Sequence, residues 1–160
     1  MSEKIAPQDT CVLVTGGAGF IGSHTVVELL KGGYQVVIVD DLSNASPKVC
    51  ERIKTIVGES AAGNLAFYEA DVNDRAALTK IFDTHRIDRV IHFAGFKAVG
   101  ESVTKPIEYY SNNIGNTLTL VDVMREHGCK SIIFSSSATV YGDPDSLPLT
   151  EESPKKPATN

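Results

Sequence analysis

The stretch CVLVTGGAGFIG, which runs from Cys11 to Gly22, decides the fold of this chain. A short apolar run leads into a turn that contains Gly16, Gly17 and Gly19, and apolar residues at helical spacing follow the turn. Glycine at such a turn removes the Cβ atoms that would keep a pyrophosphate away from the backbone. The start of the following helix presents free N–H groups and the positive end of its dipole to the anion. The spacing Gly16-x-x-Gly19-x-x-Gly22, with Gly17-x-Gly19-x-x-Gly22 as an equal fit, predicts a dinucleotide-binding strand, turn and helix.

Four more apolar runs rich in β-branched residues follow along the chain, at 35–40, 65–70, 89–94 and 131–135. Most of them are continuously apolar, which is typical of strands covered on both faces of a parallel sheet. Helical patterns fill the intervals, at about residues 20–31, 46–57, 74–85 and 105–127. This alternation predicts the α/β class and a doubly wound parallel sheet of the Rossmann type, with five strands in the order 3-2-1-4-5.

The composition places the chain among ordinary globular proteins. Its 160 residues predict one domain, and 42% hydrophobic residues are enough to build a buried core. Because 15 basic and 20 acidic residues give a net charge of -5, we expect no nucleic-acid partner. We also expect no membrane span, since no run approaches the roughly 18 apolar residues that one needs. The N-terminus lacks the apolar core of a secretory signal, so we expect a cytoplasmic protein.

The cysteines and histidines do not suggest a metal site. Cys11, Cys50 and Cys129 are far apart and form no C-x-x-C pair, which predicts reduced thiols that pack as small hydrophobic residues. The histidines show no i, i+4 spacing. His92 lies in an apolar run, where we expect a core histidine with hydrogen-bond partners. We therefore predict no metal.

An acidic residue at the end of the second predicted strand supports a nicotinamide cofactor. Asp40 follows Gly22 by 18 positions, close to the roughly 20 expected for an acid that accepts hydrogen bonds from the adenosine ribose. A carboxylate there repels a 2′-phosphate, and the segment from Gly16 to Asp41 contains no arginine to attract one. NAD is therefore expected rather than NADP.

Other candidates lie at the carboxyl ends of the remaining strands, where a doubly wound sheet places its ligand crevice. Asp71 and Val72 follow the third strand; they contact an adenine ring, or else Asp71 caps the next helix. Residues 93–95 end the fourth strand, with Lys97 beyond them as a phosphate partner. The hydroxyl groups of residues 135–137 end the fifth strand, where they reach a bound substrate or serve as turn residues.

Six segments carry a resemblance to a known family. In chain order, within about residues 12–143, they are TGGAGFIG, VDDLSN, ADV, HFAGFKAVGESV, KPIEYYSNN and FSSSATVYGD. They resemble the NAD-dependent epimerase/dehydratase family of the extended short-chain dehydrogenases/reductases, and within it the branch that acts on UDP-glucose and UDP-galactose. The resemblance implies tightly bound NAD and inversion of these UDP-sugars at C4 through a transient 4-keto sugar. It also implies a homodimer for the full-length protein.

The resemblance assigns roles to individual residues. The pair Asn112-Asn113 lies at a mid-helix position unfavourable for asparagine, which indicates a side chain engaged in hydrogen bonding, and the resemblance implies that Asn112 contacts the cofactor. Ser137 would be the active-site serine, which binds the reacting 4-hydroxyl of the substrate and helps to relay its proton. The cofactor residues that we predict are Gly16, Gly19, Phe20, Ile21, Gly22, Asp40, Asp41, Leu42, Ser43, Asn44, Ala45, Asp71, Val72, Phe93, Ala94, Gly95, Phe96, Lys97 and Asn112.

The catalytic base of the family is missing from this sequence. That base is the tyrosine of a Tyr-x-x-x-Lys motif, whose lysine lowers the pKa of the phenol from about 10. The residue four positions after each of the 5 tyrosines is not a lysine. We predict an N-terminal tail (1–10), an incomplete NAD-binding domain (11–142) and a proline-rich loop (143–160), with the later strands and the substrate domain missing. We expect this chain to be inactive by itself.

Two alternatives share the glycine turn and Asp40. One is a non-catalytic NAD-binding module, which leaves HFAGFKAVGESV and Ser137 unexplained. The other is a related NAD-dependent epimerase or dehydratase that acts on another sugar nucleotide. Such dehydratases often carry Asp or Glu near the serine, whereas Ala138 follows Ser137 here.

Overall fold

The architecture is built on five apolar strands that lie side by side. The computed structural model describes residues 6–157, and its sheet is parallel throughout, in the order β3-β2-β1-β4-β5. The strands are β1 (Cys11–Thr15), β2 (Gln35–Asp40), β3 (Leu65–Glu69), β4 (Arg89–His92) and β5 (Ile132–Phe134). The predicted fold class, strand number and strand order are confirmed.

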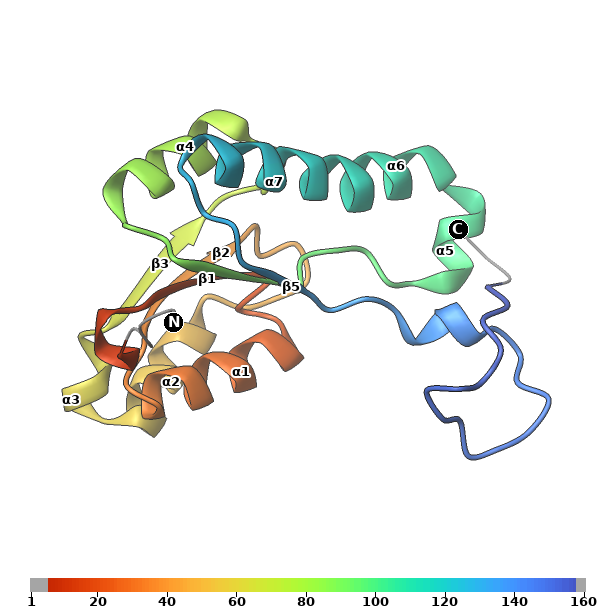
Figure 1. The fold of residues 1–160 in the computed structure, drawn as a ribbon, viewed down its shortest axis with the longest axis horizontal. Coiled ribbons are helices and arrows are strands. Elements are labelled where there is room, and N and C mark those ends of the chain that lie inside the picture. Colours follow the sequence, from red (N-terminus) through yellow and green to blue (C-terminus); the bar gives the residue numbers. More distant parts are fainter. Residues whose placement is uncertain (1–5, 158–160) are drawn as a thin grey trace, which may run out of the picture.

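Helices cover both faces of this sheet (Figure 1). One layer contains α1 (Phe20–Lys31), α2 (Lys48–Val57) and α3 (Glu59–Ala62). The other layer contains α4 (Arg75–Thr84), α6 (Pro106–Tyr110) and α7 (Asn116–Glu126), while α5 (Val99–Thr104) lies beyond the carboxyl ends of the strands. Short 3₁₀ helices lie at Pro7–Asp9 and Ala138–Tyr141.

Two apolar clusters join the sheet to the helices, because successive side chains of a strand point to opposite faces. Leu13 of β1 belongs to the cluster that includes Leu120 of α7. Its neighbour Val14 belongs to the other cluster, with Val26 and Leu30 of α1. All residues of β1 are buried, which explains why this strand is continuously apolar in the sequence.

The long helix predicted at 105–127 is not a single α-helix. It consists of α6, a π-helical turn at Ser111–Gly115, and α7, which together form one rod in Figure 1. The short helix α5, which the sequence patterns did not indicate, precedes it. Lys105 separates α5 from α6 with φ -129° and ψ 52°, since the residue before a proline is disfavoured in the helical region.

Several other boundaries differ from the predicted ones. The third, fourth and fifth strands end one or two residues earlier, at Glu69, His92 and Phe134, where the chain turns into the crevice loops. The cap of α4 is Asp74, which accepts hydrogen bonds from the N–H groups of Ala76 and Ala77, both at 3.0 Å. The capping alternative for Asp71 is therefore wrong. Helix α3 was also not predicted.

The thiols are part of the packing. In the described chain Cys11 and Cys129 are buried, Cys50 is half-buried, and all three are free. Burial raises the pKa of the Cys11 thiol to about 11, and the charge of Asp88 adds to this effect. Residues 6–157 contain no group of three or more His, Cys, Asp or Glu side chains that could hold a metal ion.

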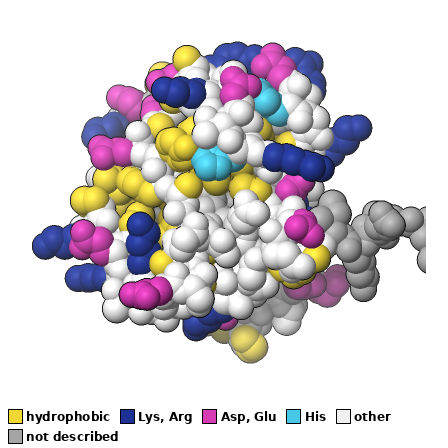
Figure 2. All heavy atoms as spheres, turned by 90° about the vertical axis from the view of Figure 1, so that its left-hand side faces the viewer, with side chains coloured by type: hydrophobic (Ala, Val, Ile, Leu, Met, Phe, Trp, Pro, Cys, Tyr) yellow, Lys and Arg dark blue, Asp and Glu magenta, His cyan; other side chains and the backbone are white. Residues whose placement is uncertain are grey.

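The surface carries charges of both signs. Figure 2 shows the face at the left of Figure 1, where basic and acidic side chains are interspersed around apolar ones. Within the part of the chain that the structure describes, no helix is long and apolar enough to cross a membrane.

Candidate functional site: a glycine turn at the carboxyl edge of the sheet

The glycine turn between β1 and α1 is crowded on its inner side. Gly16 has a φ of 67°, in the left-handed region that favours glycine. A Cβ atom on Gly16 would lie 2.7 Å from the amide nitrogen of Ala94. A Cβ atom on Gly22 would collide with the carbonyl oxygen of Gly16. The first turn of α1 thus packs directly on the loop, and the two glycines are required for this close approach.

The outer side of the same turn is open. Gly19 is the N-cap residue of α1, and its carbonyl accepts a hydrogen bond from the Ser23 N–H at 2.9 Å. The N–H groups of Phe20, Ile21 and Gly22 precede this bond, so helix geometry gives them no acceptor within α1. Phe20 is 80% exposed and Ile21 is 60% exposed. The positive end of α1 therefore faces solvent and can bind an anion such as a phosphate.

Asp40 connects the end of β2 to the glycine turn. Its buried carboxylate accepts hydrogen bonds from the Ala18 N–H at 2.9 Å and from the Leu42 N–H at 3.0 Å. Leu42 has a φ of 58°, which is uncommon for a branched side chain, and the bond to Asp40 holds it there. Because a carboxylate has about four acceptor sites, Asp40 retains capacity for the hydroxyl groups of a ribose.

The remaining residues of the predicted adenosine side form a surface loop. Asp41 accepts a hydrogen bond from the N–H of Ser43 at 2.9 Å. Asp41, Ser43 and Asn44 are exposed, and Ala45 is half-buried. Their polar groups are thus accessible beside the buried carboxylate of Asp40.

A hollow of about 390 Å³ brings two predicted cofactor residues together, namely Asp71 after β3 and Asn112 in the π-helical turn. This volume lies in the range of small-molecule sites. Asp71 accepts hydrogen bonds from the N–H and the side-chain amide of Asn73, at 2.8 and 3.2 Å. Val72 is buried in the core, so its side chain is not accessible to a ligand. The lining residues are Asp71, Asn73, Ile107, Glu108, Ser111 and Asn112.

The loop that follows β4, residues 93–97, is fastened to the helix layer by asparagines. The amide of Asn113 accepts a hydrogen bond from the Phe96 N–H at 2.7 Å and donates one to the Phe96 carbonyl at 2.9 Å. The buried Asn116 donates to the carbonyl of Ala94 at 3.5 Å. Lys97, further along the loop, is exposed.

The asparagine pair in the predicted helix indicates a side chain engaged in hydrogen bonding, and the bonds of Asn113 to Phe96 fit this prediction. We predicted a ligand role for Asn112 alone, whose side chain donates a hydrogen bond to the amide oxygen of Asn113 at 3.0 Å. Asparagine in the middle of a helical pattern favours hydrogen bonds outside the helix. In the structure this pair coincides with the π-helical turn.

His92 lies beneath this loop and is 1% exposed. Its Nδ1 is 2.6 Å from the hydroxyl oxygen of Thr15, and its Nε2 is 3.1 Å from the hydroxyl oxygen of Thr117. Burial lowers the pKa of His92 below its ordinary value, and a hydrogen bond with Asn116 partly opposes this effect. The prediction of a core histidine with hydrogen-bond partners is confirmed.

Ser137 follows β5 at the carboxyl edge of the sheet. It is the N-cap residue of the 3₁₀ helix Ala138–Tyr141, and its Oγ accepts a hydrogen bond from the Thr139 N–H at 3.2 Å. The two hydroxyl groups of Ser137 and Thr139 are 2.6 Å apart. Ser136 has a φ of 53°, so the chain turns sharply before Ser137. Ser137 is exposed, and its hydroxyl is accessible.

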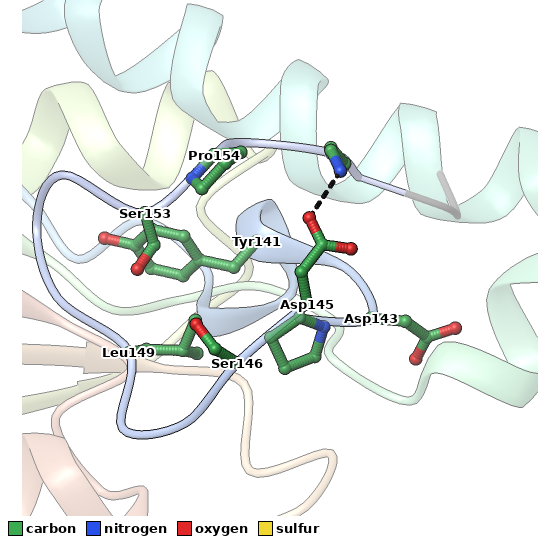
Figure 3. A pocket seen from close by; sticks show the side chains of 9 residues that line it. Tyr141, Asp143, Asp145, Ser146, Leu149, Ser153 and Pro154 are labelled. Atoms are coloured by element: carbon green, nitrogen blue, oxygen red, sulfur yellow. Dashed lines mark hydrogen bonds and ion pairs between the residues drawn. The ribbon is translucent and has the colours of Figure 1, made fainter.

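A second, smaller hollow lies within the proline-rich loop (Figure 3). The ring of Tyr141 lies beside it, and an ion pair of 2.9 Å joins Lys156 to Asp145. Its volume of about 30 Å³ has room for a water molecule but not for a nucleotide. Its lining contains none of the predicted cofactor residues of the described chain.

The class of the protein follows from this geometry. A parallel doubly wound sheet, a glycine turn at the start of α1 and a buried acid at the end of β2 define a Rossmann domain of the dinucleotide-binding class. The family model described as GDP-mannose 4,6 dehydratase matches residues 13–160. The chain belongs to the NAD-dependent epimerase/dehydratase family.

Relatives of known activity are similar to this chain over most of its length. UDP-glucose 4-epimerase 2 of Arabidopsis thaliana is 58% identical over 143 residues, which are 89% of this chain and 41% of the relative. The UDP-glucose 4-epimerase of Haemophilus influenzae is 59% identical over 141 residues, 88% of this chain and 40% of the relative. The chain thus spans about two fifths of the length of these curated relatives.

Solved structures show the same likeness. The UDP-glucose 4-epimerase of Bifidobacterium longum, in complex with NAD+ and UDP, superposes with a TM-score of 0.84 at 56% sequence identity. The match covers 92% of this chain and 43% of that one. The Stenotrophomonas maltophila enzyme, with bound NAD and formylated UDP-arabinopyranose, superposes with a TM-score of 0.85 at 44% identity, covering 94% and 44% of the two chains.

We expect Gly22→Ala to destabilise the fold by about 1–3 kcal/mol, because its methyl group meets the Gly16 carbonyl and the backbone must shift. The matched control is Gly63→Ala, where a Cβ atom meets nothing within 4 Å and φ is -65°. The control should unfold at the same or a slightly higher urea concentration than the unchanged chain. Equal unfolding free energies for the two variants would contradict the close packing at Gly22.

Proposed function

We propose that this chain is the N-terminal, NAD-binding part of an NAD-dependent UDP-glucose 4-epimerase. The observation that carries the proposal is the hydrogen bond from the Ala18 N–H to the Asp40 carboxylate, which joins the glycine turn to the ribose-binding acid. The turn, the acid and the hollow beside Asp71 together offer groups for pyrophosphate, ribose and adenine. Three cysteines that are free in the described chain fit the reducing cytoplasm that we propose as its compartment.

The residues fit the cofactor because each presents the chemistry that one part of it requires. The open N–H groups at Phe20 and Ile21 suit the pyrophosphate, and the carboxylate of Asp40 suits the ribose hydroxyls. When bound, NAD would accept the hydride from C4 of a UDP-hexose. Return of the hydride to the opposite face of the 4-keto sugar would invert that carbon. The exposed Ser137 hydroxyl, now paired with Thr139, would bind the 4-hydroxyl and help to relay its proton.

The cofactor preference provides a direct test. We expect isothermal titration calorimetry to show NAD binding to the chain at least tenfold more tightly than NADP, because the 2′-phosphate meets the Asp40 carboxylate. Asp40→Asn should weaken NAD binding and reduce the preference, since an amide carries no charge. A preference for NADP in the unchanged chain would contradict the assignment of Asp40.

The chemical step provides a second test. We expect this chain to bind NAD without converting UDP-galactose to UDP-glucose, because no tyrosine in it is followed four residues later by lysine. Product analysis of UDP-galactose after incubation with the chain and NAD measures this. Epimerisation at the rate of an intact family member would show that another residue serves as the base.

We also propose that the full-length protein is a homodimer that uses the outer face of α6, the π-helical turn and α7. Exposed apolar side chains recur there at helical spacing, at Ile107, Ile114, Leu118 and Val121. Charged side chains of α4 and α7 pair with each other within the chain, as in the 3.0 Å ion pair of Arg75 with Asp122. A continuous apolar stripe of this kind is a typical helix–helix interface.

Leu118→Lys should therefore shift the chain towards the monomer in sedimentation velocity experiments, because the lysine would place its charge in the stripe. The matched control is Ile56→Lys on α2, which replaces a side chain of similar exposure, 61% against 65% for Leu118. The control should sediment like the unchanged chain. An unchanged chain that is monomeric at all concentrations, or equal behaviour of the two variants, would contradict this interface.

A further inference from the structure

A series of hydrogen bonds passes through His92, and the donor and the acceptor of each bond can be assigned from the groups that take part. The Thr117 hydroxyl contacts two acceptors, the carbonyl oxygen of Asn113 at 2.8 Å and the amide oxygen of Asn116 at 3.3 Å. Thr117 must donate its proton to one of them, so its oxygen accepts a hydrogen bond from His92 Nε2–H. The neutral ring with its proton on Nε2 then leaves Nδ1 as an acceptor.

The other end of this series of hydrogen bonds reaches the loop 93–97 that follows β4. Nδ1 of His92 accepts the proton of the Thr15 hydroxyl, which in turn accepts a hydrogen bond from the Ala94 N–H at 3.3 Å. Thr15 is the last residue of β1 and directly precedes Gly16, which packs on Ala94. The imidazole thus orients the hydroxyl group that sets the spacing between the glycine turn and the loop after β4.

We infer that His92 is a positioning residue of the NAD site, which holds the glycine turn and the loop 93–97 at the correct separation through the hydroxyl group of Thr15. This inference rests on the proposed NAD-binding function. His92 itself is 1% exposed, so its ring is not accessible to a cofactor. Its effect on NAD is therefore indirect.

The surroundings of His92 make this arrangement sensitive to protonation. The groups that face the ring are Thr15 from β1, Asn116 and Thr117 from α7, and Phe134 from β5, whose ring centroid is 5.7 Å away. None of these described groups is charged, so none compensates an imidazolium. A protonated Nδ1 would donate to the Thr15 hydroxyl, which could then no longer donate to the ring. NAD affinity should therefore fall as the pH falls through the titration of His92.

The experiment compares the chain with two variants that each retain one of the two hydrogen bonds. His92→Asn places an amide oxygen near the position of Nδ1 and can keep the bond to Thr15. His92→Gln places its amide near the position of Nε2 and can keep only the bond to Thr117. NAD affinity is measured by isothermal titration calorimetry from about pH 8 down to the lowest pH at which the chain stays folded, because burial lowers the pKa of His92 below the ordinary range of histidine. Urea unfolding of all three proteins separates altered binding from altered stability.

We expect His92→Gln to bind NAD about tenfold more weakly than the unchanged chain at the upper end of this range, as for one lost buried hydrogen bond, and His92→Asn to lose much less. Towards acid pH the unchanged chain should lose affinity more steeply than His92→Asn, which has no titrating group there. In the unchanged chain, ¹⁵N spectra of the histidines should show Nδ1 of His92 without a proton. Added NAD should lower the midpoint of its titration, because linkage is reciprocal.

Equal NAD affinities and parallel pH profiles for the unchanged chain and both variants would overturn the positioning role of His92. A titration midpoint of His92 that stays the same on addition of NAD would overturn it as well. This measurement uses the unchanged chain alone, so it does not depend on the folding of a variant. If the unchanged chain binds no NAD at any pH, the proposed function fails, and the positioning role fails with it.

Discussion

The close approach of backbone segments at Gly16 is the constraint on which the rest of the structure depends. The N–H of Gly16 donates a hydrogen bond to the carbonyl of Val39 at 2.8 Å, which ties the turn to the end of β2. The space where a side chain would stand is taken by Ala94, and the Gly16 carbonyl supports Gly22. Three strands and one helix therefore meet within a few ångströms. Any Cβ atom here would separate the segments that carry the binding groups.

A second constraint comes from the helix layer above. The π-helical turn lies between the loops that follow β3 and β4 and contacts both of them. Asn113 holds Phe96 on one side, and on the other a Cβ atom on Gly115 would lie 2.9 Å from the side-chain oxygen of Asn73. The extra residue of a π-helical turn re-aims the side chains around it, which is why such turns are frequent at functional sites. Here one helix positions two loops of the candidate cofactor site.

Most of the fold could be predicted because its signals are local. The β-branched runs, the glycine spacing and the position of Asp40 relative to Gly22 are each contained in short segments, and doubly wound topology then follows from chain connectivity. The parts that could not be predicted depend on contacts between distant segments. The left-handed backbone of Leu42 depends on Asp40, and the π-helical turn coincides with the bonds of Asn113 to Phe96, 17 residues earlier. The spacing of apolar residues along a helix does not reveal hydrogen bonds to distant segments.

The two sides of the candidate site differ in how firmly the described chain holds them. The glycine turn follows β1, the central strand, which is buried throughout and paired on both edges. Ser137 follows β5, which has three residues, pairs only with β4 in the described sheet and leaves Ile133 63% exposed and Phe134 59% exposed. Local stability follows burial and pairing, so the opening of β5 costs less free energy than the opening of β1. The glycine turn is thus held by the most firmly paired strand of the described sheet, whereas Ser137 follows a strand that is held less firmly.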